Sequence, residues 1–415
     1  MSCAKKKIKV LYVQEPAGGG SLISLYEMLK ELNPEEIEPV VVCYYKSKYT
    51  QQLENINHCK VFYVNNGVEL NSNGSKFSKN RFLNVFLIQY YSLQKYFWQD
   101  KKLIKYINDI IQREKPDILH HNNDIGVNRP SIRAGTKTNI PQVLYNHGLP
   151  FYKFNFVEYI IDFFLLRKIR YHIHLSKAIE SHYKKLFYSS LRNTAVINSF
   201  IDRDIFKPAP AFCSIKGEFG IKENEIIISN VGRITNWKGQ HILIEAVNII
   251  KNQLPPFKVL MVGSYEKGVG SQDYLNHLQN LVCKYQLHDR IIFTGNRTDI
   301  AEVMNTSDVV VHTAVKPEPQ GIVILEALLC KKTVIASDDA GSAELIKKYG
   351  GILFQPGNAS QLAKILLRLF TNQANAIETS YPNNYEQLDA DFDSSIKAKQ
   401  IVEIYKKAMG RNRKS

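Results

Sequence analysis

Two basic residues that could bind a diphosphate follow an apolar run in the second half of the chain. The strand-like "EIIISNVG" leads into "RITNWKGQ" and then the amphipathic "HILIEAVNII", so Arg233 and Lys238 lie on a loop between a strand end and a helix start. Ligands of open α/β sheets bind at the carboxyl ends of the strands. Arginine offers a fork of donors, lysine a point charge, and Gly232 and Gly239 permit tight turns. A solvated basic loop explains either cation alone, but this placement favours phosphate binding.

Two glutamates follow a second segment of the same kind. In "DVVVHTAVKPEPQGIVILEALLCKK", Glu318 lies in the loop after a strand, and a helix is expected to begin near Gly321. A helix start presents free N–H groups and a partial positive charge, which suit an anion. Glu326 lies more than one turn further along and could accept hydrogen bonds from vicinal hydroxyls, as on a ribose. The alternative is a surface glutamate paired with Lys331 or Lys332.

A glycine-rich loop follows the first predicted strand. Gly18, Gly19 and Gly20 precede a helix that Ser21 is expected to cap, and glycines let a backbone approach a ligand closely. A dinucleotide-binding G-x-G-x-x-G motif is excluded because Ile23 occupies its third glycine position. The sequence also contains no Walker A motif.

Polar residues follow two further strands of the first half. His147, in "LYNHGLP", directly follows a strand and is expected to face a cleft between domains, where it either contacts a sugar or is structural. A weaker expectation is that the residues after "PDIL" help to shape an acceptor site; they are His120, His121, Asn122 and Asn123.

The elements that position these residues alternate between β-rich and helical patterns along most of the chain. This alternation predicts an α/β fold with parallel sheets wrapped in helices. The strands predicted in the first half are "KIKVLYV", "EPVVVCYY", "HCKVFYV", "PDILHH", "QVLYNH" and "RYHIHLS". Those predicted in the second half are "EIIISNVG", "FKVLMVGS", "IIFTG", "DVVVHTA", "KTVIAS" and "GILFQ".

The halves meet at "NSFIDRDIFKPAPAF", where Pro208 and Pro210 interrupt any helix or central strand. We therefore expect an N-terminal domain over residues 1–200 and a C-terminal domain over 201–388. Residues 389–415 are expected to form a closing helix and a basic tail, because "SSIKAKQIVEIYKKAMG" has helical spacing.

Composition limits the partners of the chain. The 415 residues have an ordinary soluble composition, but the formal net charge is +15, which is typical of proteins that meet phosphates, nucleic acid or anionic lipid. The six cysteines lack CxxC spacing, and we expect them to be reduced in a cytoplasmic protein. No stretch reaches the ~18 uncharged residues of a membrane-spanning helix. Nucleic acid is not an expected partner, because no known binding module is present.

Two segments of the first half predict peripheral contact with a membrane. Residues 76–106 hold seven Lys or Arg, nine aromatic residues and one acid, Asp100, and residues 151–172 are similar in character. Aromatic and basic residues on one helical face suit an anionic lipid surface, here the inner face of the cell membrane. The alternative is a pair of acceptor-site helices with an oily inner face and a solvated basic outer face.

Three aspartates near the C-terminus, Asp389, Asp391 and Asp393, have the oxygen ligands that a hard cation prefers. We do not predict a metal site there, because "LDADFD" precedes the closing helix, far from the residues described above. An acidic helix start explains them better.

Taken together, the chain resembles the glycosyltransferases of family 4, also called group 1, which have the GT-B fold of two facing Rossmann-like domains with an interdomain cleft. Four segments carry the resemblance: "PAGGGSLISLYEMLKEL", "AVINSFIDRDIFKP", "VGRITNWKGQHILIEA" and "EPQGIVILEALLCKKTVIASDDAGSAELI". The paired motifs G-R-x4-K-G and E-x7-E are fairly specific together. The resemblance implies transfer of a sugar, with retention at the anomeric carbon and without a metal, from a nucleotide-sugar donor to a glycan or lipid-linked acceptor.

The resemblance also implies roles for individual residues. Arg233 and Lys238 would bind the donor diphosphate, Glu326 would hold the ribose, and Glu318 would face the sugar. The remaining contacts implied for donor or sugar involve Gly19, Gly20, His147, Gly232, Gln320, Gly321, Ile322 and Val323. The chain departs from the family at Gln320, often an aromatic residue, and at "DDAGSAEL", where two adjacent glycines are usual, so the resemblance leaves the donor sugar open. A nucleotide-sugar epimerase and a non-enzymatic carbohydrate- or lipid-surface-binding protein are the alternatives.

Overall fold

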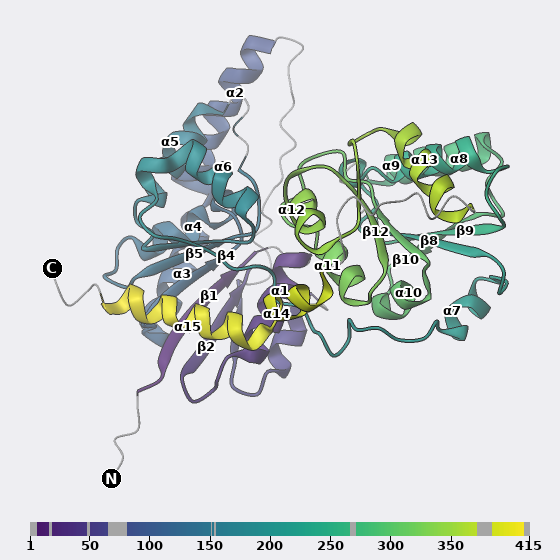
Figure 1. The fold of residues 1–415 in the computed structure, drawn as a ribbon. Coiled ribbons are helices and arrows are strands. Elements are labelled where there is room, and N and C mark those ends of the chain that lie inside the picture. Colours follow the sequence, from purple (N-terminus) through teal and green to yellow (C-terminus); the bar gives the residue numbers. More distant parts are fainter. Residues whose placement is uncertain are drawn as a thin grey trace. The chain divides into compact units, whose positions relative to one another are not determined.

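The computed structural model describes residues 6–15, 19–47, 50–64, 81–150, 152, 155–265, 271–371 and 384–410. The chain divides into two compact units, which are drawn in Figure 1. Unit 1 combines Met1–Ile201 with Ser394–Ser415, and unit 2 is Asp202–Asp393.

Unit 1 is built on a seven-stranded parallel sheet with the order β3-β2-β1-β4-β5-β6-β7. Its strands are β1 (Ile8–Gln14), β2 (Ile37–Cys43), β3 (Lys60–Tyr63), β4 (Ile118–Asn122), β5 (Gln142–Asn146), β6 (Tyr171–His174) and β7 (Thr194–Val196). Its helices are α1 (Gly20–Glu31), α2 (Arg81–Gln94), α3 (Lys101–Glu114), α4 (Ile125–Gly135), α5 (Phe156–Leu166), α6 (Lys177–Phe187) and α15 (Ser394–Gly410). Short turns of other helix types are η1 (Thr50–Asn55), η2 (Lys95–Gln99) and η3 (Tyr188–Ser190).

Unit 2 is built on a six-stranded parallel sheet with the order β10-β9-β8-β11-β12-β13. Its strands are β8 (Ile226–Val231), β9 (Phe257–Val262), β10 (Ile291–Gly295), β11 (Val309–His312), β12 (Thr333–Ser337) and β13 (Ile352–Phe354). Its helices are α7 (Cys213–Glu218), α8 (Gln240–Ile250), α9 (Ser271–Lys284), α10 (Ile300–Thr306), α11 (Ile322–Leu329), α12 (Ala340–Tyr349), α13 (Ala359–Phe370) and α14 (Tyr385–Asp391), with a 3-10 turn η4 (Asn236–Lys238).

The predicted α/β architecture is confirmed, and all twelve predicted strands form. Central strands such as β1, with the sequence IKVLYVQ, are buried almost throughout because helices cover both faces of a parallel sheet. Strand β7 was missed, since its three residues are too short to show a pattern.

The C-terminal helix α15 packs on unit 1. The Tyr405 hydroxyl lies 2.7 Å from Nδ1 of His120 and 3.1 Å from the Tyr12 hydroxyl, inside the core. Nζ of Lys397 donates to the Ser199 carbonyl at 2.8 Å. The last described helix therefore completes the domain in which the chain begins.

Two local predictions about helix starts are wrong. Helix α1 begins at Gly20, and its N-cap is Gly19 with φ of 98°, which glycine adopts readily, so Ser21 lies inside the first turn. Gly18 lies outside the described residues.

The acidic "LDADFD" stretch does not begin the closing helix. Asp389 and Asp391 end helix α14, and no acid lies in the first turn of α15. Arg203 pairs with Asp389 and Asp393, while Lys348 and the Tyr349 hydroxyl contact Asp391. The three carboxylates are thus held by neighbouring side chains. No described helix is long and apolar enough to cross a membrane.

Candidate functional site

The predicted phosphate-binding residues of unit 2 lie where the order of its sheet reverses. Strands β8 and β11 are neighbours, and the chain leaves them toward opposite ends of the sheet. Ligands of open α/β sheets bind at the carboxyl ends of strands at such a point. Lys238 follows β8 and Glu318 follows β11, so topology alone brings their loops together.

Hydrogen bonds tie these two loops to each other. The Thr313 hydroxyl donates to the Lys238 carbonyl at 2.9 Å, and Nδ2 of Asn230 donates to that hydroxyl at 3.1 Å. The Trp237 indole donates to the Lys316 carbonyl at 3.1 Å. The loop that carries Lys238 is thereby fixed against the loop that carries Glu318.

Gly239 makes this close approach possible. It has φ of 65°, and an added Cβ would lie 2.2 Å from the Thr313 carbonyl oxygen. We expect Gly239→Ala to lower the free energy of unfolding of unit 2 by more than about 2 kcal/mol, because the left-handed conformation alone costs about 1–2 kcal/mol. Urea denaturation measures the change. Gly217→Ala is the control, since nothing lies within 4 Å of its added Cβ. Equal effects would contradict this account.

Lys238 and Glu318 form a largely buried ion pair, with 2.7 Å between Nζ and Oε2. Nε2 of His312 lies 3.6 Å from the same carboxylate oxygen. Burial opposes ionisation of Glu318, but the positive charge of Lys238, assisted by His312, outweighs it and lowers the pKa of the carboxyl to about 2. A carboxylate thus neutralises the lysine, and an incoming diphosphate would compete with it for the same cation.

Arg233 lies on the same loop, and its side chain is exposed. Its carbonyl accepts a hydrogen bond of 2.9 Å from Nε2 of Gln240, at the start of α8. The preceding Gly232 has φ of 153° at the end of β8. The backbone of Arg233 is held at this position, and the residue as a whole is exposed.

The segment after Glu318 is held by the start of α12. The Gly341 N–H donates to the Glu318 carbonyl at 2.9 Å, and an added Cβ at Gly341 would lie 2.3 Å from the Pro319 carbonyl oxygen. Gln320 is buried here. Gly321, with φ of 78°, is the N-cap of α11, whose first turn contains the half-buried Ile322 and Val323. One glycine of "DDAGSAEL" is therefore needed for close packing.

Glu326 is buried inside unit 2 rather than paired on a helix surface. Its side chain is 7% exposed, and no described residue donates a hydrogen bond to its carboxylate. Lys331 instead lies over the Tyr385 ring, and Lys332 donates to the Asn305 carbonyl at 2.6 Å. Burial raises the pKa of the Glu326 carboxyl to about 7. A buried carboxyl without a donor is costly, so it is a candidate ligand-binding group.

In unit 1, the predicted residues His147, Asn122 and Asn123 belong to one polar network at the ends of β1, β4 and β5. Nε2 of His147 lies 3.0 Å from Oδ1 of Asn122, whose amide donates to Gln14. Asn123 donates to the Glu15 carbonyl at 2.8 Å. Burial lowers the pKa of His147 to about 3, so its ring is neutral.

Sequence reasoning missed Gln14 and Glu15, and it misjudged two histidines. Gln14 ends the first strand beside β4 and Glu15 follows it, and that position could have marked them. Burial raises the pKa of Glu15 to about 7. His120 and His121 instead lie in the interior, where His121 contacts Ser131 and Gln142.

Comparison with solved structures shows the fold of the chain. The structure superposes with a TM-score of 0.74 on HepE of Anabaena, solved in complex with UDP-glucose, at 23% identity over 96% of this chain and 100% of that one. It also matches a sucrose-phosphate synthase of Thermosynechococcus elongatus, with a TM-score of 0.73 and 20% identity over 98% of this chain and all of that one. The chain has the GT-B fold, as predicted.

Residues 213–387 match the family of glycosyl transferases group 1. An uncharacterized glycosyltransferase of Methanocaldococcus jannaschii is 25% identical over 260 residues, which are 62% of each chain. A D-inositol 3-phosphate glycosyltransferase of Mycobacteroides abscessus is 30% identical over 148 residues, 35% of this chain and 32% of that protein. The chain thus spans less than two thirds of the length of these relatives. Residues 213–387 thus resemble group 1 glycosyl transferases, and the resemblance predicted from the sequence is confirmed for this part of the chain.

Proposed function

We propose that the protein transfers a sugar from a nucleotide-sugar donor to a glycan or lipid-linked acceptor. The observation that carries the proposal is the buried carboxyl of Glu326, which receives no hydrogen bond from any described residue. It lies in the same unit as the buried ion pair between Lys238 and Glu318. A nucleotide sugar has vicinal hydroxyls and a diphosphate. Glu326 offers a hydrogen-bond acceptor for the hydroxyls, and Lys238 offers a cation for the diphosphate.

Each donor-binding residue has a distinct role in this proposal. Lys238, Arg233 and the helix start at Gly321 stabilise the negative charge that develops on the diphosphate as the sugar leaves. Glu326 accepts hydrogen bonds from the ribose hydroxyls. Glu318, released from Lys238 by the incoming phosphate, orients the sugar. Gly232, Gln320, Ile322 and Val323 complete the donor contacts.

The reaction needs no side-chain nucleophile. The bond between the anomeric carbon and the leaving phosphate oxygen breaks, and the acceptor oxygen bonds to that carbon on the same face. The acceptor proton passes to the leaving phosphate. We propose that this reaction retains the anomeric configuration and proceeds without a metal.

Unit 1 supplies the acceptor side in this proposal. The neutral ring of His147 can exchange hydrogen bonds with a sugar hydroxyl, and Gly19 and Gly20 let the backbone approach the substrates. The complex of HepE with UDP-glucose makes a UDP-sugar the first donor to test. A relative in Erwinia amylovora, an amylovoran biosynthesis glycosyltransferase that is 27% identical over 185 residues, supports a role in polysaccharide synthesis. We place this activity in the cytoplasm, at the inner face of the membrane.

A panel of nucleotide sugars tests the proposal through melting temperature, because a ligand that binds the native state stabilises it. We expect one nucleotide sugar to raise the melting temperature and to be consumed when a glycan or lipid-linked acceptor is added. Consumption without an acceptor, giving an isomer of the donor, would instead indicate an epimerase. Binding without consumption would indicate a non-enzymatic binding protein.

Glu326→Gln should separate binding from stability. Loss of hydrogen bonds to a charged acceptor should weaken nucleotide-sugar binding by about 10- to 100-fold. The same change should stabilise unit 2 at pH 8 by about 1–3 kcal/mol, because the raised pKa means that ionising the native carboxyl is unfavourable. This gain in stability should shrink as the pH falls below about 7, and it should vanish near the pKa that the Glu326 carboxyl has in the unfolded chain.

Melting curves at pH 8 and pH 5, with and without the nucleotide sugar, measure both effects. Glu223→Gln is the matched control, because its carboxylate is largely exposed. A Glu326→Gln variant that binds the donor normally would remove the ribose role from this residue.

A further inference from the structure

Helix α5 of unit 1 turns large apolar side chains toward solvent. Phe156, Ile160 and Phe164 recur at four-residue spacing, so they share one face of the helix, and they are 66%, 38% and 60% exposed. The opposite face carries Asp162, which is fully buried. A helix on the surface of a soluble protein normally has the reverse arrangement.

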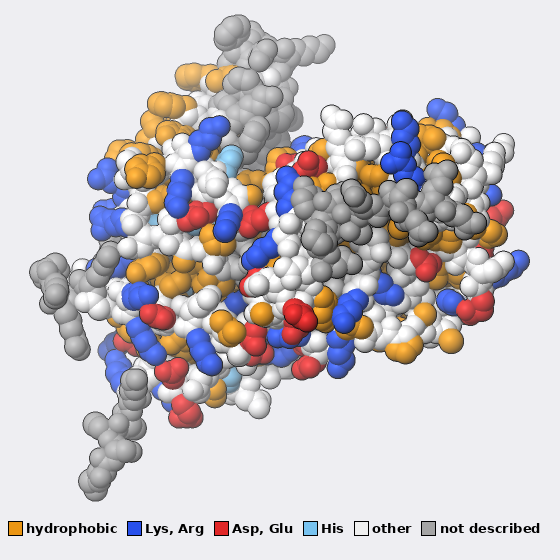
Figure 2. Space-filling model, viewed as in Figure 1, with side chains coloured by type: hydrophobic (Ala, Val, Ile, Leu, Met, Phe, Trp, Pro, Cys, Tyr) orange, Lys and Arg blue, Asp and Glu red, His pale blue; other side chains and the backbone are white. Residues whose placement is uncertain are grey.

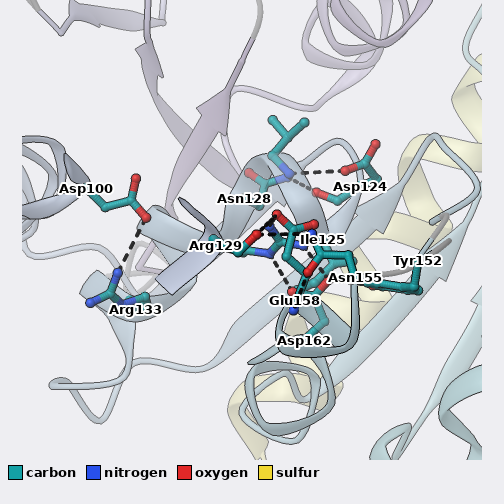
Figure 3. A network of polar contacts seen from close by, with 12 residues as sticks. Asp100, Asp124, Ile125, Asn128, Arg129, Arg133, Tyr152, Asn155, Glu158 and Asp162 are labelled. Atoms are coloured by element: carbon teal, nitrogen blue, oxygen red, sulfur yellow. Dashed lines mark hydrogen bonds and ion pairs between the residues drawn. The ribbon is translucent and has the colours of Figure 1, made fainter. Parts of the chain in front are cut away.

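Ion pairs inside unit 1 hold α5 in this orientation. Figure 3 shows Arg129, on α4, between the carboxylates of Asp162 and Glu158. Nε of Arg129 lies 2.7 Å from Asp162 and Nη1 lies 2.9 Å from Glu158, while the Tyr152 hydroxyl donates to Asp162. Rotating α5 to bury its apolar face would break this fork and leave Arg129 unpaired in the interior. The outward apolar face is therefore built into the fold.

Helix α2 and the turn η2 extend the apolar surface. Phe86, Tyr90 and Phe97 recur at helical spacing and are 70%, 55% and 49% exposed, and Trp98 is 62% exposed. Polar contacts join α2 to α5: the Val157 N–H donates to Oε1 of Gln89 at 2.8 Å, and Asn155 donates to the Ser92 hydroxyl at 3.1 Å. In Figure 2, hydrophobic side chains gather over α5. We call the exposed side chains Phe86, Tyr90, Phe97, Trp98, Phe156 and Phe164 the aromatic face.

Positive charges flank the aromatic face. Lys95 lies in η2, exposed lysines begin α3, and Arg167 and Lys168 follow α5. Asp100 lies between Lys95 and the lysines of α3, but it is buried, and its carboxylate lies 3.4 Å from Arg133. The exposed charges that directly flank these helices in sequence are thus basic, in a chain of net charge +15. A second copy docking through the same face would bring these like charges together, whereas a surface of anionic phosphates would neutralise them.

We propose that the aromatic face docks onto an anionic lipid bilayer. The aromatic rings would enter the interface between headgroups and acyl chains, while the lysines bind lipid phosphates. The eleven residues of α5 form a helix about 16 Å long, against the ~30 Å hydrocarbon core of a bilayer, so the helix lies in the surface rather than across it. This interaction goes beyond sugar transfer and does not require it.

Co-sedimentation of the full chain with vesicles tests the proposal. We expect binding to vesicles of phosphatidylcholine with phosphatidylglycerol, weak binding to phosphatidylcholine alone, and a blue shift of Trp98 fluorescence in a Trp237→Phe background. Phe156→Ser with Phe164→Ser should reduce binding at least about tenfold. Lys101→Gln, Lys102→Gln and Lys105→Gln should each reduce binding about fivefold at low salt.

Ile205→Ser with Ile249→Ser is the matched control, because both residues are exposed and lie in unit 2, and it should bind like the parent chain. Nucleotide-sugar melting shifts, measured in parallel with Trp237 in place, should be unchanged in the serine, glutamine and control variants, which separates this proposal from the transfer activity. Equal binding to neutral vesicles, or serine variants that bind normally, would overturn it. Self-association of the parent chain without lipid, abolished by the serine variants, would also overturn it by making a second copy the occupant.

Discussion

Replacing Lys238 with alanine is expected to slow sugar transfer by about 100-fold, which corresponds to about 3 kcal/mol of lost transition-state stabilisation. The reason is that Nζ of Lys238 lies at the sheet edge on a loop held by Thr313, where charge develops on the leaving diphosphate. Arg233→Ala should have an effect of similar size. Steady-state rates at saturating donor and acceptor measure both.

The neighbouring Lys316→Ala provides the control, since Lys316 is an exposed lysine on the loop that precedes Glu318. It should retain normal turnover. The double variant Lys238→Ala with Glu318→Gln removes both members of the ion pair, so it avoids leaving a buried, unpaired carboxylate. If Lys238→Ala were slow only because it unfolds, this double variant would regain both stability and rate, whereas the phosphate role predicts regained stability without regained rate. Near-normal turnover in Lys238→Ala would refute the phosphate role.

Unit 1 is expected to lose stability before unit 2 as the pH falls from 7 to 5. Five histidines of its sheet region are buried, and burial lowers their pKa: to about 3 in His147 and His172, to about 4 in His121 and His174, and well below the usual value in His120. The native state keeps them neutral, while the unfolded chain binds protons near pH 6.5. Their stabilising effect is therefore full above that pH and is lost as the pH falls.

The expected loss is large. Each of these histidines costs about 1 kcal/mol at pH 5.5, and together they remove several kcal/mol, a large part of the stability of a domain. Glu15 opposes this trend, because its raised pKa favours proton uptake by the native state. This uptake raises the free energy of unfolding by about 2 kcal/mol as the pH falls. In unit 2, Glu318 stays ionised until the pH approaches about 2.

Hydrogen exchange resolved by peptide, at a series of pH values, measures the two units separately. Strands β4 to β6 should lose protection at a higher pH than strands β8 to β12. His172→Phe should reduce the acid sensitivity, because neither ring nitrogen of His172 has a hydrogen-bond partner among the described residues. Loss of protection in unit 2 first would contradict this prediction.

The strands and the positions of the loops that carry Lys238 and Glu318 could be predicted because their signals are local. Buried parallel strands have continuous apolar runs, and glycines mark the tight turns beside Lys238 and Gly321. The burial of Glu326 could not be predicted, because the eight residues of α11 are apolar on almost every side and the partners of Lys331 and Lys332 lie on other segments.

The orientation of α5 was equally inaccessible from the sequence. Its amphipathic pattern is visible, but the face that turns inward is decided by Arg129, which lies 33 residues before Asp162. The cap of α1 was misjudged for a different reason. Both serine and glycine are good caps, and the left-handed φ of Gly19 decides between them.

A crystal structure of the protein with the nucleotide sugar that gives the largest melting shift would show whether Lys238 and Glu326 bind the donor. We expect the diphosphate to lie against Nζ of Lys238 and the N-terminus of α11, with the ribose hydroxyls within hydrogen-bond distance of Glu326. A diphosphate bound elsewhere, with the Lys238–Glu318 ion pair intact and Glu326 still without a partner, would contradict it.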